Sequence, residues 1–307
     1  FGRKGKHFYL YPVLYRPTKT ENLSRGVPII RPGCPSEQKG EISCFLKKVC
    51  DIFRSRTRGV EMLKNFKLTI EYDGNAYHGW QRQTNERSIQ GEIEKAIMTM
   101  TGERTSLIGS GRTDAGVHAL GQVANFHSDT DLAPSAFLKG LTSLLHKDIV
   151  IKACSRVHRQ FHARYDAKSK TYSYRILNLS QPAAVCRQYA WFISKKLDTD
   201  TMKKAIAHIV GIHDFKAFEG TGSSRSNTTR NVMDAALVCQ ERGKLVFNFK
   251  ADGFLRYMVR NIVGTLVEVG RGKITPNVFK HILISRDRNL AGATAPPHGL
   301  FLMEVKY

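Results

Sequence analysis

The 307-residue sequence lacks the marks of several common protein classes. No run approaches the roughly 18 apolar residues that a membrane-spanning helix needs. The six cysteines include no C-x-x-C pair, and no Cys/His quartet has zinc-finger spacing. Neither G-x-x-x-x-G-K-S/T nor G-x-G-x-x-G occurs. These absences argue against a membrane span, a zinc finger and a nucleotide-phosphate cradle, and they suggest that the cysteines are reduced thiols in a reducing compartment.

Acidic residues are also scarce. The chain has 26 Asp and Glu residues against 48 Lys and Arg residues, a formal net charge of +22. Such an excess favours a polyanionic partner, and nucleic acid is the leading candidate. The alternative is a basic protein with no such partner. The chain is 41% hydrophobic, which is enough for a sizeable core in one large domain or two of ordinary size.

Residues 1–61 differ from the rest of the sequence. They hold 13 basic and 5 acidic residues and half of the cysteines, with little periodicity. The chain begins with Phe1, and Met62 precedes the first clear strand and turn. We therefore expect Met62 to be a natural start and 1–61 an extension outside the fold; a basic targeting arm is the alternative. The remaining residues keep a net charge of +14, so the argument for nucleic acid does not depend on the extension.

After Met62 the apolar pattern alternates between strand and helix periods. Helices are expected over 88–103, 133–148, 198–215, 255–270 and 275–287, with Ser88 and Thr275 as N-caps. Gly102 is expected to stop the first helix, and Val210 to lie on the apolar face of the third. Strands are expected over 66–74, 104–109, 121–128, 148–157, 170–178, 231–240, 244–254 and 299–307. Strands 231–240 and 244–254 are expected to form a hairpin around residues 241–243. This order favours an α+β fold: two similar halves, 62–169 and 170–307, with mostly antiparallel sheets, flanking helices and an active-site cleft between them.

The most unusual stretch is "GSGRTDAGVHALGQVANF", residues 109–126. It places a single carboxylate, Asp114, in a glycine-rich turn after an apolar segment. Taken alone, "TDAG" is an ordinary turn in which Asp caps the backbone and Gly supplies positive φ. A lone Asp also argues against ordinary glycoside hydrolysis, which generally uses two carboxyl groups.

The whole string closely resembles the catalytic motif of the TruA-type tRNA pseudouridine synthases. Further blocks resemble the same family in the same order, over about residues 65–307. These blocks are "YDGNAYHGWQRQ" (72–83), "FHARYDAKSKTYSYRI" (161–176), "HDFKAFEG" (213–220), "DGFLRYMVRNIVGTLVEVGRGK" (252–273) and "APPHGLFLMEVKY" (295–307). So many ordered matches are very improbable by chance.

The resemblance implies roles for three catalytic residues. Pseudouridine formation breaks the uracil N–C1′ bond, rotates the base and rejoins it through C5. One carboxylate can attack the sugar or the base and then leave. By resemblance Asp114 is that nucleophile, Arg260 pairs with it and orients it, and Tyr172 stacks on the target base. Without the motif, Arg260 would be interpreted as a helix-surface charge and Tyr172 as a core aromatic.

Five further residues are expected to bind the substrate: Arg112, Leu300, His118, Arg164 and Lys170. The resemblance assigns Arg112 to base extrusion, with a phosphate contact as the alternative. It places Leu300 beneath the base. His118 is expected to build the loop or to touch RNA, and Arg164 and Lys170 to contact phosphates.

The resemblance also implies an isomerase acting on uridines 38, 39 and 40 of the tRNA anticodon stem-loop. It implies a homodimer that binds tRNA, needs no cofactor and no metal ion, and works in the cytoplasm with no membrane attachment. Two alternatives remain open. One is a non-catalytic RNA-binding or tRNA-folding protein with the same fold, and the other is a related synthase with another RNA target.

Overall fold

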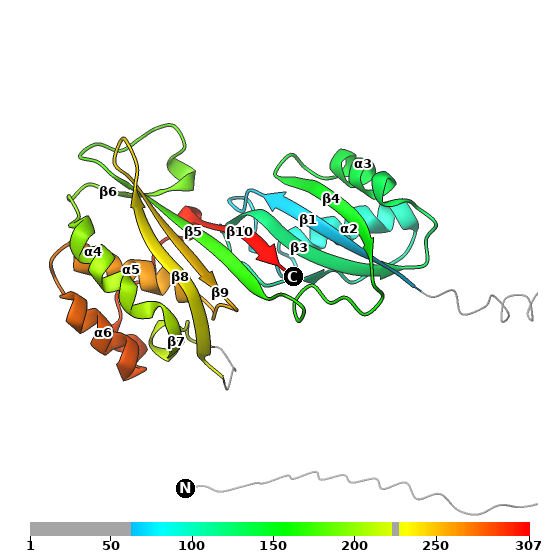
Figure 1. Ribbon diagram of the computed structural model, residues 1–307. Coiled ribbons are helices and arrows are strands. Elements are labelled where there is room, and N and C mark those ends of the chain that lie inside the picture. The colour runs from blue at the N-terminus through cyan, green and yellow to red at the C-terminus, as the bar shows by residue number, and fades with distance from the viewer. Residues whose placement is uncertain (1–62, 223–226) are drawn as a thin grey trace, which may run out of the picture. The chain divides into compact units, whose positions relative to one another are not determined.

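One mixed sheet runs through the part of the chain that the computed structural model describes, residues 63–222 and 227–307. These residues belong to one compact unit, 61–307. The predictions for residues 1–61 lie outside the described residues. The main strands follow the order β4-β1-β3-β10-β5-β9-β8-β7, with β2 paired to β3 and β6 paired to β5 (Figure 1). The strands are β1 (Lys64–Tyr72), β2 (Ile108–Gly109), β3 (His118–Ser128), β4 (Ile149–Val157), β5 (Ser169–Asn178), β6 (Trp191–Ile193), β7 (Gly211–Asp214), β8 (Thr229–Cys239), β9 (Lys244–Ala251) and β10 (Leu300–Lys306).

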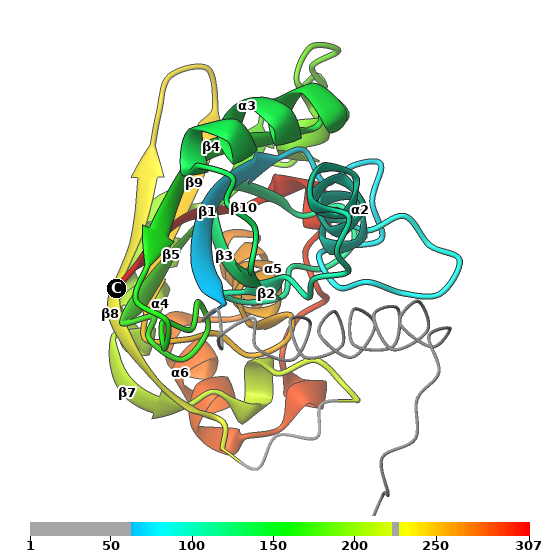
Figure 2. The same cartoon turned by 90° about the vertical axis from the view of Figure 1, so that its right-hand side faces the viewer.

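The N-terminal half pairs β1 with β3 and β4, both antiparallel, and α2 and α3 lie on the same side of these strands (Figure 2). Alternate residues of β1 are buried under them, including Phe66, Leu68 and Ile70. The sequence predicted the start and end of α2, and the structure confirms both. Ser88 accepts a hydrogen bond from the Gly91 amide, and Gly102 ends the helix in the left-handed region at φ 74°. The described α-helices are α2 (Ile89–Thr101), α3 (Pro134–Leu144), α4 (Thr199–Ile206), α5 (Met258–Gly270) and α6 (Pro276–Ser285).

The C-terminal half pairs β5, β9, β8 and β7 in antiparallel order. The expected hairpin of β8 and β9 is present. The predicted cap of α6 is also confirmed, because the Thr275 hydroxyl accepts from the Val278 amide at 3.3 Å. None of the helices described in either half is long and apolar enough to cross a membrane.

The prediction of one helix over 198–215 is wrong in its second half. The helix α4 ends at Ile206, a short 3-10 turn follows, and the chain then enters the edge strand β7. Gly211 adopts φ 106°, which no helix permits. Ile212 pairs with Asn231 of β8 and is exposed. Val210, which was expected on the buried face of the helix, is exposed as well.

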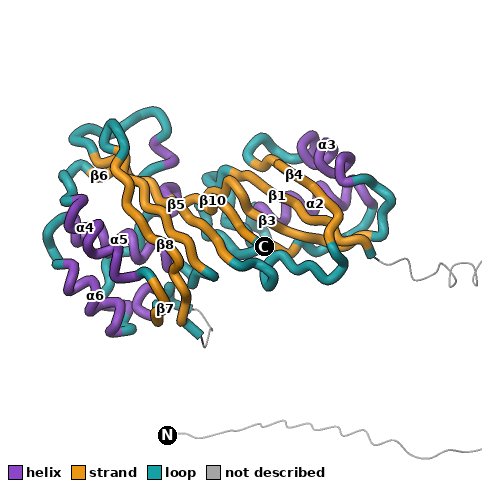
Figure 3. The backbone as a smooth tube through the Cα atoms, in the orientation of Figure 1, coloured by secondary structure: helices purple, strands orange, loops and turns teal. Residues whose placement is uncertain are grey.

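The strand β10 joins the two halves into one sheet, as Figure 3 shows by the strands that continue on both sides of it. It pairs antiparallel with β5 and parallel with β3, the latter through Phe301–His118 and Leu302–Ala119. The predicted α+β fold with two helix-and-strand halves and mostly antiparallel pairing is confirmed. The continuity of the sheet brings the turn after β2 close to the start of α5.

Candidate active site

An ion pair joins the two halves of the chain at the turn between β2 and β3. Arg260, in the first turn of α5, places its Nη1 atom 3.0 Å from Oδ2 of Asp114. About a quarter of the Asp114 side chain and 13% of the Arg260 side chain remain exposed. A partly buried, charge-assisted pair of this kind is stronger than an exposed one and fixes the direction of the carboxylate.

Arg260 is held from behind by the segment that leads into β10. Its Nε donates to the Ala295 carbonyl at 2.7 Å, and the Ala295 amide donates back to the Arg260 carbonyl at 3.1 Å. This close approach depends on Gly264, one helical turn along. A Cβ atom there would lie 1.7 Å from the carbonyl oxygen of Ala293. The glycine of "RNIVG" therefore permits the contact that orients the arginine.

Thr113 holds the turn in place just before Asp114. Its carbonyl accepts from the Trp80 amide at 3.1 Å, and its hydroxyl shares a buried 2.7 Å hydrogen bond with the hydroxyl of Tyr72. A Cβ on Gly79 would lie 2.6 Å from the same Thr113 carbonyl. Because both the backbone and the side chain of Thr113 are held, the adjacent Asp114 has little conformational freedom.

The charge state of Asp114 is set by opposing effects. Burial raises the pKa of its carboxyl above the usual value, while Arg260 and, more weakly, Arg256 lower it. Burial is the largest of these influences, so the pKa stays raised. An acid that is partly desolvated and paired with a neighbouring cation is typical of a reactive group in an active site.

Tyr172 lies on β5 near the ion pair, with 7% of its surface exposed. Its ring meets Phe254 edge-on, with centroids 5.0 Å apart. Burial raises its pKa, and the negative charge of Asp114 acts in the same direction. The phenol therefore stays protonated at neutral pH. The site thus holds a carboxylate, a paired arginine and a buried aromatic ring within one cluster.

A comparison with known proteins identifies the family of the chain as a whole. Residues 68–166 and 205–307 match the sequence profile of the family described as tRNA pseudouridine synthase. The chain belongs to this family. The synthase relatives named tRNA pseudouridine synthase A include one of Acetivibrio thermocellus, 48% identical over 246 residues, and one of Clostridium acetobutylicum, 46% identical over 245 residues. Each alignment covers 80% of this chain and all of the relative.

Other residues expected at the candidate site divide into exposed and buried groups. Arg112 is exposed two residues before Asp114, and Arg164 is exposed with its guanidinium over the ring of Tyr165 at 5.5 Å. Leu300 is buried at the start of β10, where it pairs with Tyr174 of β5. Arg112 and Leu300 were expected from the resemblance and Arg164 from its basic side chain near a motif block, whereas Tyr165 and Tyr174 were not expected.

His118 is buried and does not fit the predicted substrate contact. Its side chain is 2% exposed, its Nδ1 accepts from the Gly74 amide at 3.1 Å, and its ring stacks on Phe301. A ring enclosed by β3, β10 and the turn at Asp73 has no surface for RNA. The loop-building alternative is the one that the geometry supports.

Lys170 also has a partner inside the protein. Its ammonium group donates to the Ser110 carbonyl, and Gln122 donates to the neighbouring Gly111 carbonyl at 3.0 Å. These two bonds hold the chain just before Arg112. The geometry therefore supports Lys170 as a group that positions the loop rather than as a phosphate contact on open surface.

Sequence reasoning missed several residues around the synthase site. Tyr72 and Thr113 were interpreted only as parts of a strand and a turn, although a hydroxyl on each was available to pair. Arg256 and Tyr257 were passed over in favour of Arg260, which the motif assigned. A useful signal was the pair of arginines four residues apart in "RYMVR", one just before α5 and the other in its first turn. Within the two described ranges, no group of three or more His, Cys, Asp or Glu side chains could hold a metal ion.

Proposed function

We propose that the protein converts uridine to pseudouridine at positions 38, 39 and 40 of the tRNA anticodon stem-loop, with Asp114 as the nucleophile. The membership of the tRNA pseudouridine synthase family supports the reaction. The observation that carries the site assignment is the 3.0 Å ion pair of Asp114 and Arg260 between the two halves. Tyr172 lies close enough to Asp114 for the charge of that carboxylate to raise the pKa of its phenol.

The proposed reaction is a balanced isomerisation. Asp114 attacks the sugar or the base, the N1–C1′ bond breaks, and the base rotates in place. A C5–C1′ bond then forms, C5 loses its proton, N1 gains one, and the carboxylate leaves. No electron is transferred, so the proposal includes no cofactor. Arg260 stabilises the carboxylate in the form that can attack and later leave.

The target base has to leave its stack before the carboxylate can reach it. We assign the bound base to the ring of Tyr172, with Leu300 beneath it, because stacking on aromatic rings is a common way to hold an unpaired RNA base. Burial keeps the Tyr172 phenol protonated, which favours stacking or hydrogen-bond donation over action as a base. Arg112, exposed beside Asp114, is available to fill the gap that the base leaves.

The proposal extends to the partners of the enzyme. The net charge of +22 supports binding to a polyanion such as tRNA. Assembly as a homodimer and action in the cytoplasm follow from the family resemblance alone. The alternative is that the protein binds tRNA without modifying it. In that case no pseudouridine should form.

Replacement of Tyr172 separates stacking from chemistry. Tyr172→Phe keeps the ring, so we expect a single-turnover rate within about tenfold of wild type. Tyr172→Leu removes the stacking surface, and since stacking contributes about 1–3 kcal/mol per base we expect a loss of up to about 100-fold. Rapid-quench kinetics on bound tRNA measure both rates. A Leu variant as fast as wild type excludes the stacking role, and a Phe variant as slow as Leu assigns proton transfer to the hydroxyl.

The test of the function itself is tritium release from tRNA labelled at uridine C5. We expect release from transcripts that carry a uridine at position 38, 39 or 40 and none when all three are cytidine. Release from the triple replacement points to another target uridine. Tight binding with no release from any transcript supports the non-catalytic alternative.

A further inference from the structure

We propose that Arg256 binds the phosphate next to the target uridine, so that the RNA backbone is fixed beside Asp114. This inference rests on the proposed function and deepens it. Arg256 lies in the short connection between β9 and α5, four residues before Arg260, and its side chain is exposed. An exposed arginine beside the nucleophile is well placed for the anionic part of a nucleotide.

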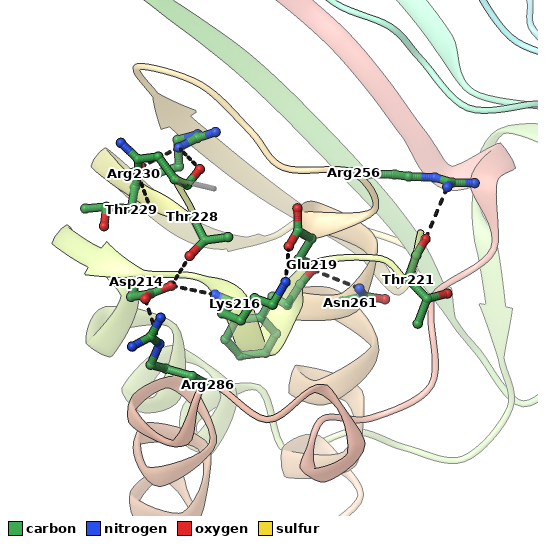
Figure 4. A network of polar contacts seen from close by, with 12 residues as sticks. Asp214, Lys216, Glu219, Thr221, Thr228, Thr229, Arg230, Arg256, Asn261 and Arg286 are labelled. Carbon is green, nitrogen blue, oxygen red and sulfur yellow. Dashed lines mark hydrogen bonds and ion pairs between the residues drawn. The ribbon is translucent and has the colours of Figure 1, made fainter. Parts of the chain in front are cut away.

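The guanidinium group of Arg256 is held by two hydrogen bonds. Its Nη1 donates to the Thr221 carbonyl at 3.1 Å, a contact that Figure 4 shows, and its Nη2 donates to the Tyr257 hydroxyl at 3.1 Å. A guanidinium has five N–H donors, so these bonds occupy two of them. Most exposed arginines lose side-chain entropy when they bind, whereas a side chain already fixed loses less.

Tyr257 forms a platform between two arginines. The guanidinium carbon of Arg256 lies 4.7 Å from the centroid of its ring, and that of Arg260 lies 4.9 Å from it. Both distances are within the range of a cation–π contact. The ring therefore sets the spacing between the arginine that pairs with Asp114 and the arginine that we assign to phosphate.

The backbone at this platform adopts a conformation that few residues accept. Tyr257 has φ 60° and caps α5 in the left-handed region, which is strained for a residue other than glycine. The ring fits because Gly220 lies against it, where a Cβ would be 2.4 Å from the ring carbon Cδ2. The Gly220 amide also donates to the Arg256 carbonyl at 2.8 Å. Such strain at a ligand site indicates a requirement for this geometry.

The base of the platform is tied to the core of the C-terminal half. Asn261 donates to the Phe218 carbonyl at 2.8 Å, and Lys216 pairs with Glu219 at 2.8 Å, both in the network of Figure 4. These contacts fix the segment that carries Gly220 against α5. The platform is therefore part of a rigid region, which suits precise placement of a ligand.

The charge balance fits an anionic ligand. Asp114 and Arg260 neutralise each other in their ion pair. Arg256 has no carboxylate within ion-pair distance in residues 63–222 and 227–307, although it is close enough to Asp114 to lower the pKa of that carboxyl. In an RNA substrate the nearest negative group to a reacting ribose is its own flanking phosphate. A phosphate held there supplies the negative charge that the site lacks.

The test pairs an enzyme variant with a chemical change in the RNA. Anticodon stem-loop RNAs carry a neutral methylphosphonate at the linkage 5′ or 3′ to the target uridine. Full-length wild type and Arg256→Gln are compared with each RNA in single-turnover and affinity measurements. We expect Arg256→Gln to lose about 10- to 100-fold with the unmodified RNA, as for removal of a charged hydrogen bond. One of the two methylphosphonates should lower the rate and affinity of wild type by a similar factor. The same RNA should lower those of Arg256→Gln almost no further.

Salt dependence gives a second readout. Loss of one phosphate contact should make the slope of log affinity against log salt shallower by about one unit. Arg242→Gln, at the hairpin turn at the other end of β9, is the matched control and should leave rate and slope unchanged. Tyr257→Phe removes the hydroxyl that holds Arg256 but keeps the ring, so it should show a smaller loss at the same linkage.

The outcomes separate this inference from the proposed function. If the losses from Arg256→Gln and from each methylphosphonate multiply, Arg256 does not bind that phosphate and the inference fails. If both neutral RNAs react like the unmodified RNA with wild type, it fails even when Arg256→Gln cannot be purified in a folded form. A wild-type enzyme that makes no pseudouridine in any tRNA overturns the proposed function instead.

Discussion

Replacing Asp114 by asparagine is expected to abolish pseudouridine formation while tRNA still binds. The substitution keeps the size of the side chain and its hydrogen bond to Arg260, but an amide cannot serve as the nucleophile. We expect the single-turnover rate to fall by at least about 10⁴-fold, which corresponds to about 5.4 kcal/mol of barrier. Affinity should stay within about threefold of wild type, because only one charge changes. Tritium release and filter binding on the same preparation measure the two effects.

The matched control for this variant is Asp200→Asn. Asp200 lies on α4 and pairs with Lys203, and 83% of its side chain is exposed. It should leave both rate and affinity unchanged. Turnover of Asp114→Asn within about tenfold of wild type, less than about 1.4 kcal/mol of barrier, is incompatible with a nucleophilic Asp114. If Asp114→Asn does not yield folded protein, Asp114→Ser is the second variant for the same measurements.

Removing the charge of Arg260 should make the enzyme sensitive to mild acid. Burial raises the pKa of Asp114, and Arg260 is the largest influence that lowers it. Since only the ionised carboxylate attacks, activity is present above the pKa of the folded enzyme and is lost as the pH falls through it. In Arg260→Gln that acid limb should move upward by about one to two pH units. Single-turnover rates between pH 4 and pH 9 measure the shift.

Two further variants test the cause of this shift. Arg260→Lys keeps a positive charge near Asp114 but cannot reproduce the fork that also reaches Ala295, so its rate should fall while the acid limb moves less. Arg271→Gln removes an arginine that pairs with Glu268 at the far end of α5 and should change neither quantity. An acid limb that stays in place in Arg260→Gln means that Arg260 does not hold Asp114 in its ionised form.

Local patterns in the sequence predicted much of the secondary structure. The helix α2 has a serine before its first turn and a glycine after its last, and both act as expected. The hairpin of β8 and β9 follows from two alternating runs around a turn. In such elements the determining contacts lie within a few residues of one another, so they leave a mark in the sequence.

Elements that depend on distant partners were harder to predict. The segment after Ile206 continues an apolar pattern that looks helical, but it pairs as β7 with the start of β8. Gly211 has no side chain, so it can adopt its φ of 106°. Strand pairing with a segment about 20 residues away outweighs the local helical pattern of apolar residues. No pattern in the sequence near β3 or β10 indicated that these two strands pair in parallel.

Residue types alone predicted only part of the candidate site. Asp114 attracted attention as a single carboxylate in a glycine-rich turn, but its pairing with Arg260 came from the family resemblance, because 146 residues separate them. His118 was expected either to build the loop or to touch RNA, and only the parallel contact of β3 with β10, which encloses it, favours the first. Whether a side chain faces the substrate or the core depended here on a strand from the other end of the sequence.

The position of β10 has a consequence for how the protein is made. Each of its neighbours in the sheet, β3 and β5, is translated earlier, and β3 precedes it by roughly 180 residues. On the ribosome both halves can begin to fold while the edges of β3 and β5 are still unpaired. The same late segment carries Ala295, which positions Arg260. A nascent chain therefore acquires an ordered pair of Asp114 and Arg260 only after β10 has emerged, and until then the open edges of β3 and β5 are exposed to pairing with other chains.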